Sequence, residues 1–98
     1  MEIIKNLDND KLTLAIKGRL DTTTAPSLER ELKSGLNGIS ELVFDLSDLV
    51  YISSAGLRVL LSAQKVMNKQ GKMVVQHANT DIMDVFEVTG FVDILNIE

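Results

Sequence analysis

The sequence predicts an α/β fold in which a mixed β-sheet opens with an antiparallel hairpin and carries helices packed over it. Three observations lead to this prediction. An alternating apolar segment follows an acidic turn near the start of the chain, two short apolar segments at 41–46 and 72–77 are typical of interior strands, and amphipathic segments lie between them. Strands joined through helices of this kind usually run parallel, by right-handed crossovers. The expected order is strand, strand, helix, strand, helix, strand, helix and one final short element.

The hairpin is predicted from two apolar segments and the residues between them. Ile3-Ile4 supplies the first strand. In the second strand, at 12–17, Leu12, Leu14 and Ile16 alternate with smaller or more polar residues, which is the period of a half-buried strand. The acidic turn at 7–11 contains residue types that tolerate left-handed backbone. We expect the second strand to end at the segment 18–21.

The first helix is predicted to begin near Pro26 and to end at Gly35 or Gly38. Its capping residue is left open. The residues expected on its buried face are Ala25, Leu28, Leu32 and Leu36.

The second helix is predicted from Ser54 to Lys69 and is closed by Gly71. Its apolar face is broad, which favours a well-buried helix. The residues of this face are Leu57, Val59, Leu60, Leu61, Ala63, Val66 and Met67.

The third helix is predicted to be capped by Thr80-Asp81 and to end at Gly90. The segment from Val92 to Ile97 fits either a strand or a short helix, and the pattern does not decide between them.

Composition and charge exclude several function classes. The length of 98 residues predicts one domain over 1–98, and 45% hydrophobic with 24% charged residues argues against disorder. The absence of cysteine excludes disulfides and cysteine-based metal chemistry. No signal pattern or membrane-spanning segment is evident, so we expect a cytoplasmic protein with no membrane partner. A net charge of −4 with scattered basic residues argues against nucleic acid as a partner.

Few groups suited to catalysis occur in the chain. The single histidine, His77, ends a predicted core strand and is expected to be exposed or bonded to a backbone carbonyl. Ser54, His77 and Asp45 are the residue types of a hydrolytic triad, but the nucleophile elbow Gly-x-Ser-x-Gly is absent. No glycine-rich phosphate loop occurs, and Asp45 and Asp48 are expected to be solvated rather than to hold magnesium. The sequence therefore favours a binding module with no cofactor and no metal over an enzyme.

The most distinctive feature is the pair Ser53-Ser54 at the predicted start of the second helix. One of these serines could simply cap the helix, which stabilises a protein by about 1 kcal/mol. The alternative is a phosphorylation site, because unpaired N–H groups and the helix dipole favour negative charge at this position. Arg58, one turn further on, could pair with the phosphate. The residues alone leave both interpretations open.

Residues 45–61 (Asp-Leu-Ser-Asp-Leu-Val-Tyr-Ile-Ser-Ser-Ala-Gly-Leu-Arg-Val-Leu-Leu) resemble the signature of the anti-sigma factor antagonist family, the small single-domain STAS proteins. Gly18-Arg-Leu-Asp21 with its following threonines resembles the family's first block. The segments 71–75 and 88–91 resemble later blocks, so the resemblance covers nearly the whole chain. It implies a mixed sheet with helices packed on one side, in agreement with the element order.

The resemblance also implies a function, partner switching. In this family the unmodified protein binds an anti-sigma factor that is also a serine kinase, and the sigma factor is released. The kinase then phosphorylates a serine at the start of the second helix and breaks the complex, which a phosphatase of the PP2C type restores. The aligned motif implies Ser54 as the acceptor, with Ser53 as second choice because it is a neighbouring hydroxyl, in a position where the family usually has Asp. The implied partner-binding residues are Asp21, Thr22, Thr23, Ser53, Ser54, Ala55, Gly56, Leu57 and Arg58.

Two alternatives remain beside this interpretation. Related STAS domains serve as subunits that dock on a transporter ATPase or a signalling complex without phosphorylation. The third hypothesis is an enzyme with hydrolase or nucleotide-binding activity. We expect a protein that is not itself an enzyme and that is a monomer when free.

Overall fold

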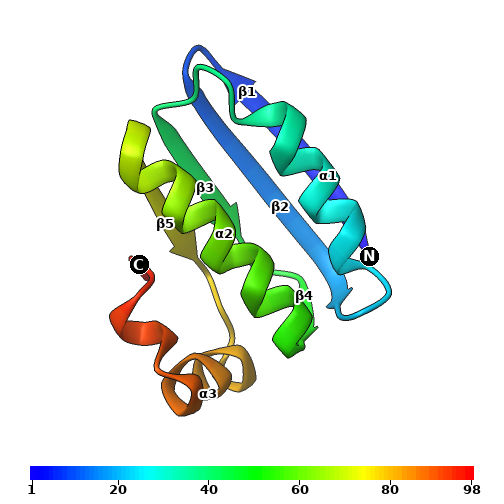
Figure 1. Cartoon of the computed structure of the whole chain (residues 1–98). Coiled ribbons are helices and arrows are strands. Elements are labelled where there is room, and N and C mark those ends of the chain that lie inside the picture. The colour runs from blue at the N-terminus through cyan, green and yellow to red at the C-terminus, as the bar shows by residue number, and fades with distance from the viewer.

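Five strands form one mixed sheet in the computed structural model, which describes all 98 residues (Figure 1). The strands are β1 (Glu2–Asp8), β2 (Lys11–Leu20), β3 (Glu41–Asp45), β4 (Leu49–Ile52) and β5 (Lys72–Gln76). The helices are α1 (Ala25–Gly35), α2 (Ser54–Gln70) and α3 (Thr80–Thr89), followed by a 3₁₀ helix at Phe91–Asp93. The main strand order is β1-β2-β3-β5, and only the β1–β2 pair is antiparallel. The predicted fold class is confirmed.

The N-terminal hairpin is confirmed, and its second strand ends at Leu20, within the predicted segment 18–21. Asn9 takes a left-handed backbone with φ 56° in the turn, and Leu12, Leu14 and Ile16 are buried. The strand continues past residue 17 to Leu20, through an irregularity at Gly18 where φ is 86°. Beyond this point β2 changes its parallel partner from β3 to β4. The glycine therefore marks a bend inside the strand and not its end.

The strand β4 was not predicted. It has only four residues, and its exposed pair Val50-Tyr51 lies between buried Leu49 and Ile52, so it lacks the alternation that identifies a strand. A tight turn closed by a 3.1 Å bond from the Leu49 N–H to the Leu46 carbonyl separates it from β3. Both strands run parallel to β2. The strand β3 pairs with residues 11–15 of β2, and β4 pairs with residues 18–20.

The core lies between the sheet and the two helices α1 and α2, which run side by side over one face (Figure 1). The predicted face of the first helix is buried throughout. In α2, Leu61 is only half-buried and Val66 is 42% exposed, so the buried face of this helix is narrower than predicted. Both helices begin at the end of the molecule where β2 and β4 finish. Their N-termini therefore lie on the same side.

The third helix lies beyond the end of the sheet, and its cap differs from the prediction (Figure 1). The capping residue is Asn79, whose side chain accepts a 2.9 Å bond from the Ile82 N–H and donates a 3.1 Å bond to the Leu49 carbonyl. The cap thus also ties α3 to β4. The C-terminal segment contains both of the elements left open, a 3₁₀ helix and then a single parallel bridge between Ile97 and Val75. None of the helices combines the length and apolar character needed to span a membrane.

Candidate functional site

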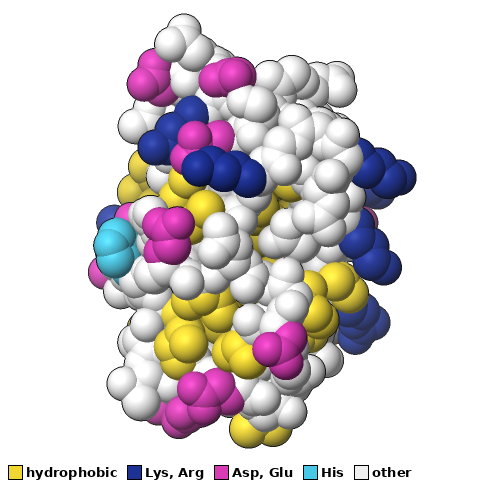
Figure 2. Space-filling view, turned by 90° about the vertical axis from the view of Figure 1, so that its left-hand side faces the viewer, with side chains coloured by type: hydrophobic (Ala, Val, Ile, Leu, Met, Phe, Trp, Pro, Cys, Tyr) yellow, Lys and Arg dark blue, Asp and Glu magenta, His cyan; other side chains and the backbone are white.

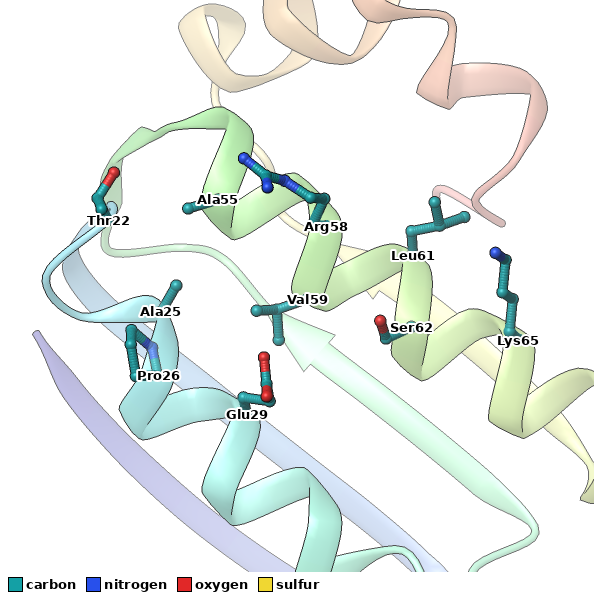
Figure 3. A pocket seen from close by; sticks show the side chains of 10 residues that line it. All are labelled: Thr22, Ala25, Pro26, Glu29, Ala55, Arg58, Val59, Leu61, Ser62 and Lys65. Atoms are coloured by element: carbon teal, nitrogen blue, oxygen red, sulfur yellow. The ribbon is translucent and has the colours of Figure 1, made fainter.

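The predicted site residues come from two segments that the sheet brings together. One is the loop after β2, with Asp21, Thr22 and Thr23, and the other is the first turn of α2. A 2.9 Å bond from the Ser53 N–H to the Leu20 carbonyl extends the β2–β4 ladder and fixes the start of α2 beside this loop. Thr22, Ala55 and Arg58 then line the same open pocket of about 460 Å³ (Figure 3).

The two serines differ in accessibility. Ser54 is the first residue of α2, is exposed, and its hydroxyl makes no hydrogen bond. Ser53 occupies the N-cap position with extended backbone, but its hydroxyl oxygen is buried and makes no hydrogen bond, including none to the helix. The interpretation of this pair as a helix cap is therefore wrong for the side chains. The hydroxyl open to an approaching enzyme is that of Ser54.

Replacing Ser53 with alanine is expected to change the free energy of unfolding by less than about 0.5 kcal/mol, or to raise it slightly, because no cap bond is lost and an unpaired buried hydroxyl is removed. Urea denaturation of the variant and the wild type measures this. A loss near the 1 kcal/mol typical of a helix cap would show that Ser53 bonds the helix in solution.

Gly56 and Leu57, two of the expected partner-binding residues, face the interior of the protein. Leu57 is 5% exposed and Gly56 is buried. A Cβ at Gly56 would lie 2.8 Å from Leu20 Cγ, 2.9 Å from Ile52 Cγ1 and 3.0 Å from the Leu20 carbonyl oxygen. The missing side chain therefore allows the first turn of α2 to sit directly on the ends of β2 and β4. The contribution of this pair is to position the exposed residues Ser54 and Arg58.

Asp21 holds its own loop in shape. Its carboxylate accepts bonds of 3.0 and 3.1 Å from the N–H groups of Thr23 and Thr24, and the Thr24 hydroxyl links the Asp21 N–H to the Arg19 carbonyl. The bond from the Thr24 N–H, together with the Thr24 hydroxyl, the Thr23 N–H and nearby Arg19, lowers the pKa of Asp21. Thr22 and Thr23 are exposed beside it. No pattern in the sequence indicated this internal role.

Arg58 is exposed and makes no ion pair. Its side chain extends along α2 toward Ala55 and the first turn (Figure 3), as side chains on a helix commonly point toward its N-terminus. Two further features of this end were not anticipated. Arg19 lies over the ring of Tyr51 at 4.2 Å, and Lys65 lines the same pocket as Arg58. The sequence signal for the second feature was the seven-residue spacing of Arg58 and Lys65 in a helix that contains no acidic residue.

His77 is exposed, as expected, and its partner is a carboxylate and not a backbone carbonyl. Its Nδ1 lies 3.0 Å from Asp45 Oδ1, and the Ser47 hydroxyl bonds the same oxygen. The serine near this pair is thus Ser47, and it contacts the carboxylate instead of the imidazole, which is not the order of a hydrolytic triad. Asp48 faces Lys17 at 3.6 Å. The arrangement is a surface hydrogen-bond cluster at the ends of β3 and β5.

The free energy of unfolding is expected to decrease as the pH drops below about 4, the range in which aspartate ordinarily titrates. The Ser47 hydroxyl, with further bonds from His77 and the Ser47 N–H, lowers the pKa of Asp45, and the pKa of Asp21 is lowered as well. A depressed folded pKa contributes stability that is present above the unfolded pKa and lost as pH falls through the folded pKa. Urea midpoints measured at neutral and acidic pH follow this loss. Asp45→Asn should make the decline shallower, whereas Asp84→Asn, which removes no bond or ion pair, should leave it unchanged.

Comparison with known proteins identifies the family of this chain. The STAS domain family model matches residues 2–98. BtrV of Bordetella bronchiseptica, whose name describes a candidate anti-sigma factor antagonist, is 34% identical over 99% of this chain and 85% of its own length. The anti-sigma-B factor antagonist of Listeria monocytogenes is 31% identical over 97% of this chain and 85% of its own.

Solved structures share the fold at low sequence identity. An anti-sigma factor antagonist from Mycobacterium paratuberculosis superimposes with a TM-score of 0.88 at 21% identity, covering 98% of this chain and 83% of its own. The anti-sigma factor antagonist SpoIIAA gives 0.78 in both its unphosphorylated and its phosphorylated form, at 10% and 11% identity. These two matches cover 99% of this chain and 87% and 91% of theirs. With the family model matched from end to end and relatives above 30% identity, this chain belongs to the STAS domain family.

Proposed function

We propose that this protein is an anti-sigma factor antagonist that works by partner switching, controlled by phosphorylation of Ser54. The observation that carries the proposal is the exposed, unbonded Ser54 hydroxyl on the first residue of α2, beside a buried Ser53 hydroxyl. The relatives named anti-sigma-B factor antagonist support the partner class. In this proposal the unphosphorylated form binds an anti-sigma factor that is a serine kinase, and a PP2C-type phosphatase reverses the modification.

The position of Ser54 fits a switch that changes the surface and leaves the fold intact. No acidic residue occupies the first turn of α2, so the positive end of the helix dipole is not yet compensated there. A phosphate adds nearly two negative charges, which the unpaired N–H groups of this turn tolerate. Arg58 has no ion-pair partner and could meet the phosphate from one turn away. The new charge would repel an acidic or tightly fitted partner.

The remaining parts of the proposal follow from the same role. Residues 1–98 would act as one STAS domain in the cytoplasm, as a regulatory binding protein and not as an enzyme. Asp21, Thr22 and Thr23 would flank the contact made by Ser54, Ala55 and Arg58. The alternative of a scaffold subunit on a transporter ATPase uses the same fold without the phosphate, and phosphate incorporation at Ser54 separates the two.

The test is to incubate the protein with its cognate kinase and ATP and to locate the phosphate by mass spectrometry. We expect one phosphate on Ser54, none in Ser54→Ala, and full incorporation in Ser53→Ala, the matched control. Incorporation into Ser54→Ala would assign the acceptor elsewhere. A pull-down that returns a transporter ATPase in place of a kinase, with no phosphate on either serine, would favour the scaffold.

A further inference from the structure

A groove between α1 and α2 continues from the Ser54 end of the molecule (Figure 3). Two adjoining pockets of about 460 and 270 Å³ form it and share Glu29, Val59 and Ser62. The small side chains of Ala25 and Ala55 face its first part (Figure 3). Most of its apolar lining is buried, including Ala25, Leu32 and Val59. The apolar lining residues that remain accessible to a partner are Pro26, Ala55, Leu61 and Val66.

Two of the three basic residues of α2, Arg58 and Lys65, line the groove in a chain of net charge −4. This helix contains Arg58, Lys65 and Lys69 and no acidic residue, and none of the three forms an ion pair. Six of the other seven basic residues do form one. Figure 2 shows basic side chains aligned along one edge and acidic ones at the end that α3 occupies. Glu29, the acid in the groove, is bound to Lys33 at 3.4 Å. The cations of α2 thus lack a counter-charge within the molecule.

We propose that this groove binds an acidic amphipathic helix of the anti-sigma factor, a proposal that rests on the function inferred above. Arg58 and Lys65 are seven residues apart, or two helical turns and about 10 Å along the axis. Leu61 lies between the two side chains along α2, so a single small anion does not meet both (Figure 3). Acidic residues two turns apart on a partner helix match this spacing. The apolar face of that helix would cover the groove, as in other helix-in-groove complexes.

This placement connects the groove to the phosphorylation site. The groove starts at Ala55, next to Ser54, and Arg58 extends toward the same turn (Figure 3). A phosphate on Ser54 therefore competes with a partner carboxylate for Arg58 and brings negative charge to the mouth of the groove. Release of the partner then follows from lost pairing as well as from repulsion.

The test measures the dissociation constant for the purified cognate anti-sigma kinase by calorimetry. Lys65→Glu is expected to weaken binding about 10-fold or more and to reduce its dependence on salt. Arg30→Glu is the matched control, because Arg30 is also an exposed helical cation without an ion pair but lies outside the groove. It should change the constant less than about 3-fold. Ser62→Phe, at an exposed residue shared by both pockets, should block the groove without changing charge and weaken binding about 10-fold.

The outcomes separate this proposal from the function on which it rests. If the wild type binds and is phosphorylated while Lys65→Glu behaves like Arg30→Glu, the groove is not the contact and the proposed function stands. If the wild type binds no anti-sigma kinase, both proposals fail. If sedimentation shows self-association that Lys65→Glu abolishes, the occupant is a second copy of the chain and the proposal is overturned. Urea denaturation of each variant establishes that it is folded.

Discussion

Gly71→Ala is expected to lower the free energy of unfolding by about 3 kcal/mol, the upper part of the range for inserting a methyl group into a packed site. A Cβ at this position would lie 1.9 Å from the Ser40 carbonyl oxygen and 2.6 Å from its carbon. The φ angle of 171° is extended and open to any residue, so the cost is steric. Either α2 or the segment that carries Ser40 has to move.

That segment is held in place by several bonds, which is why it cannot move cheaply. The side-chain amide of Gln70 donates two bonds of 2.7 Å, to the carbonyls of Leu36 and Ile39. The Lys72 N–H donates a 2.9 Å bond to the same Ser40 carbonyl. Ser40 is further bonded to Asp10 through its hydroxyl, at 2.6 Å. Relief of the clash breaks part of this network, which joins α2 to β3 and the hairpin turn.

The matched control is Gly35→Ala. The nearest atom to a Cβ at Gly35 lies 3.8 Å away, and its φ is not in the left-handed region. Alanine should therefore be neutral there or stabilise by up to about 1 kcal/mol, since it costs less backbone entropy than glycine. Urea denaturation of both variants measures the difference. A Gly71→Ala variant as stable as Gly35→Ala would contradict the close contact with Ser40.

The elements with a clear local period were predictable from the sequence. The alternation of Leu12, Leu14 and Ile16 and the helical spacing in α1 both reflect burial on one face, which is a local property. The strand β4 was missed because it is a strand by virtue of its pairing with β2 beyond Gly18, a contact distant in sequence. Gly71 was interpreted as a helix end. Its closeness to Ser40, 31 positions earlier, has no trace in local pattern.

The candidate site shows the same division. The serine pair at the start of a helix could be recognised from the order of residue types alone. The different surroundings of the Ser53 and Ser54 hydroxyls depend on how β4 enters α2, and the burial of Gly56 depends on Leu20 and Ile52. The groove could not be predicted from the sequence, because it forms only where α1 and α2 lie side by side. The spacing of the charged residues along α2 was visible in the sequence, but the position of α1 on the other side of the groove was not.

Ser54→Asp is expected to weaken partner binding about 100-fold while the protein stays folded. The carboxylate places a negative charge on the first residue of α2, beside the proposed contact surface of Thr22, Ala55 and Arg58. Because the first turn has no other acid, this charge should interact favourably with the helix dipole and raise the free energy of unfolding by about 0.3–1 kcal/mol. Binding and stability are therefore expected to change in opposite directions. Calorimetric titration with the anti-sigma kinase and urea denaturation measure the two effects.

Ser54→Asn separates charge from size, because asparagine has the shape of aspartate and no charge. If the switch is electrostatic, the asparagine variant should bind within about 5-fold of the wild type while the aspartate variant fails. Equal losses in both variants would mean that the partner closes tightly over the Ser54 hydroxyl and that bulk alone breaks the contact. Undiminished binding of Ser54→Asp would remove the charge-based switch altogether. The phosphorylated wild type should be the weakest binder, since a phosphate carries nearly twice the charge of aspartate.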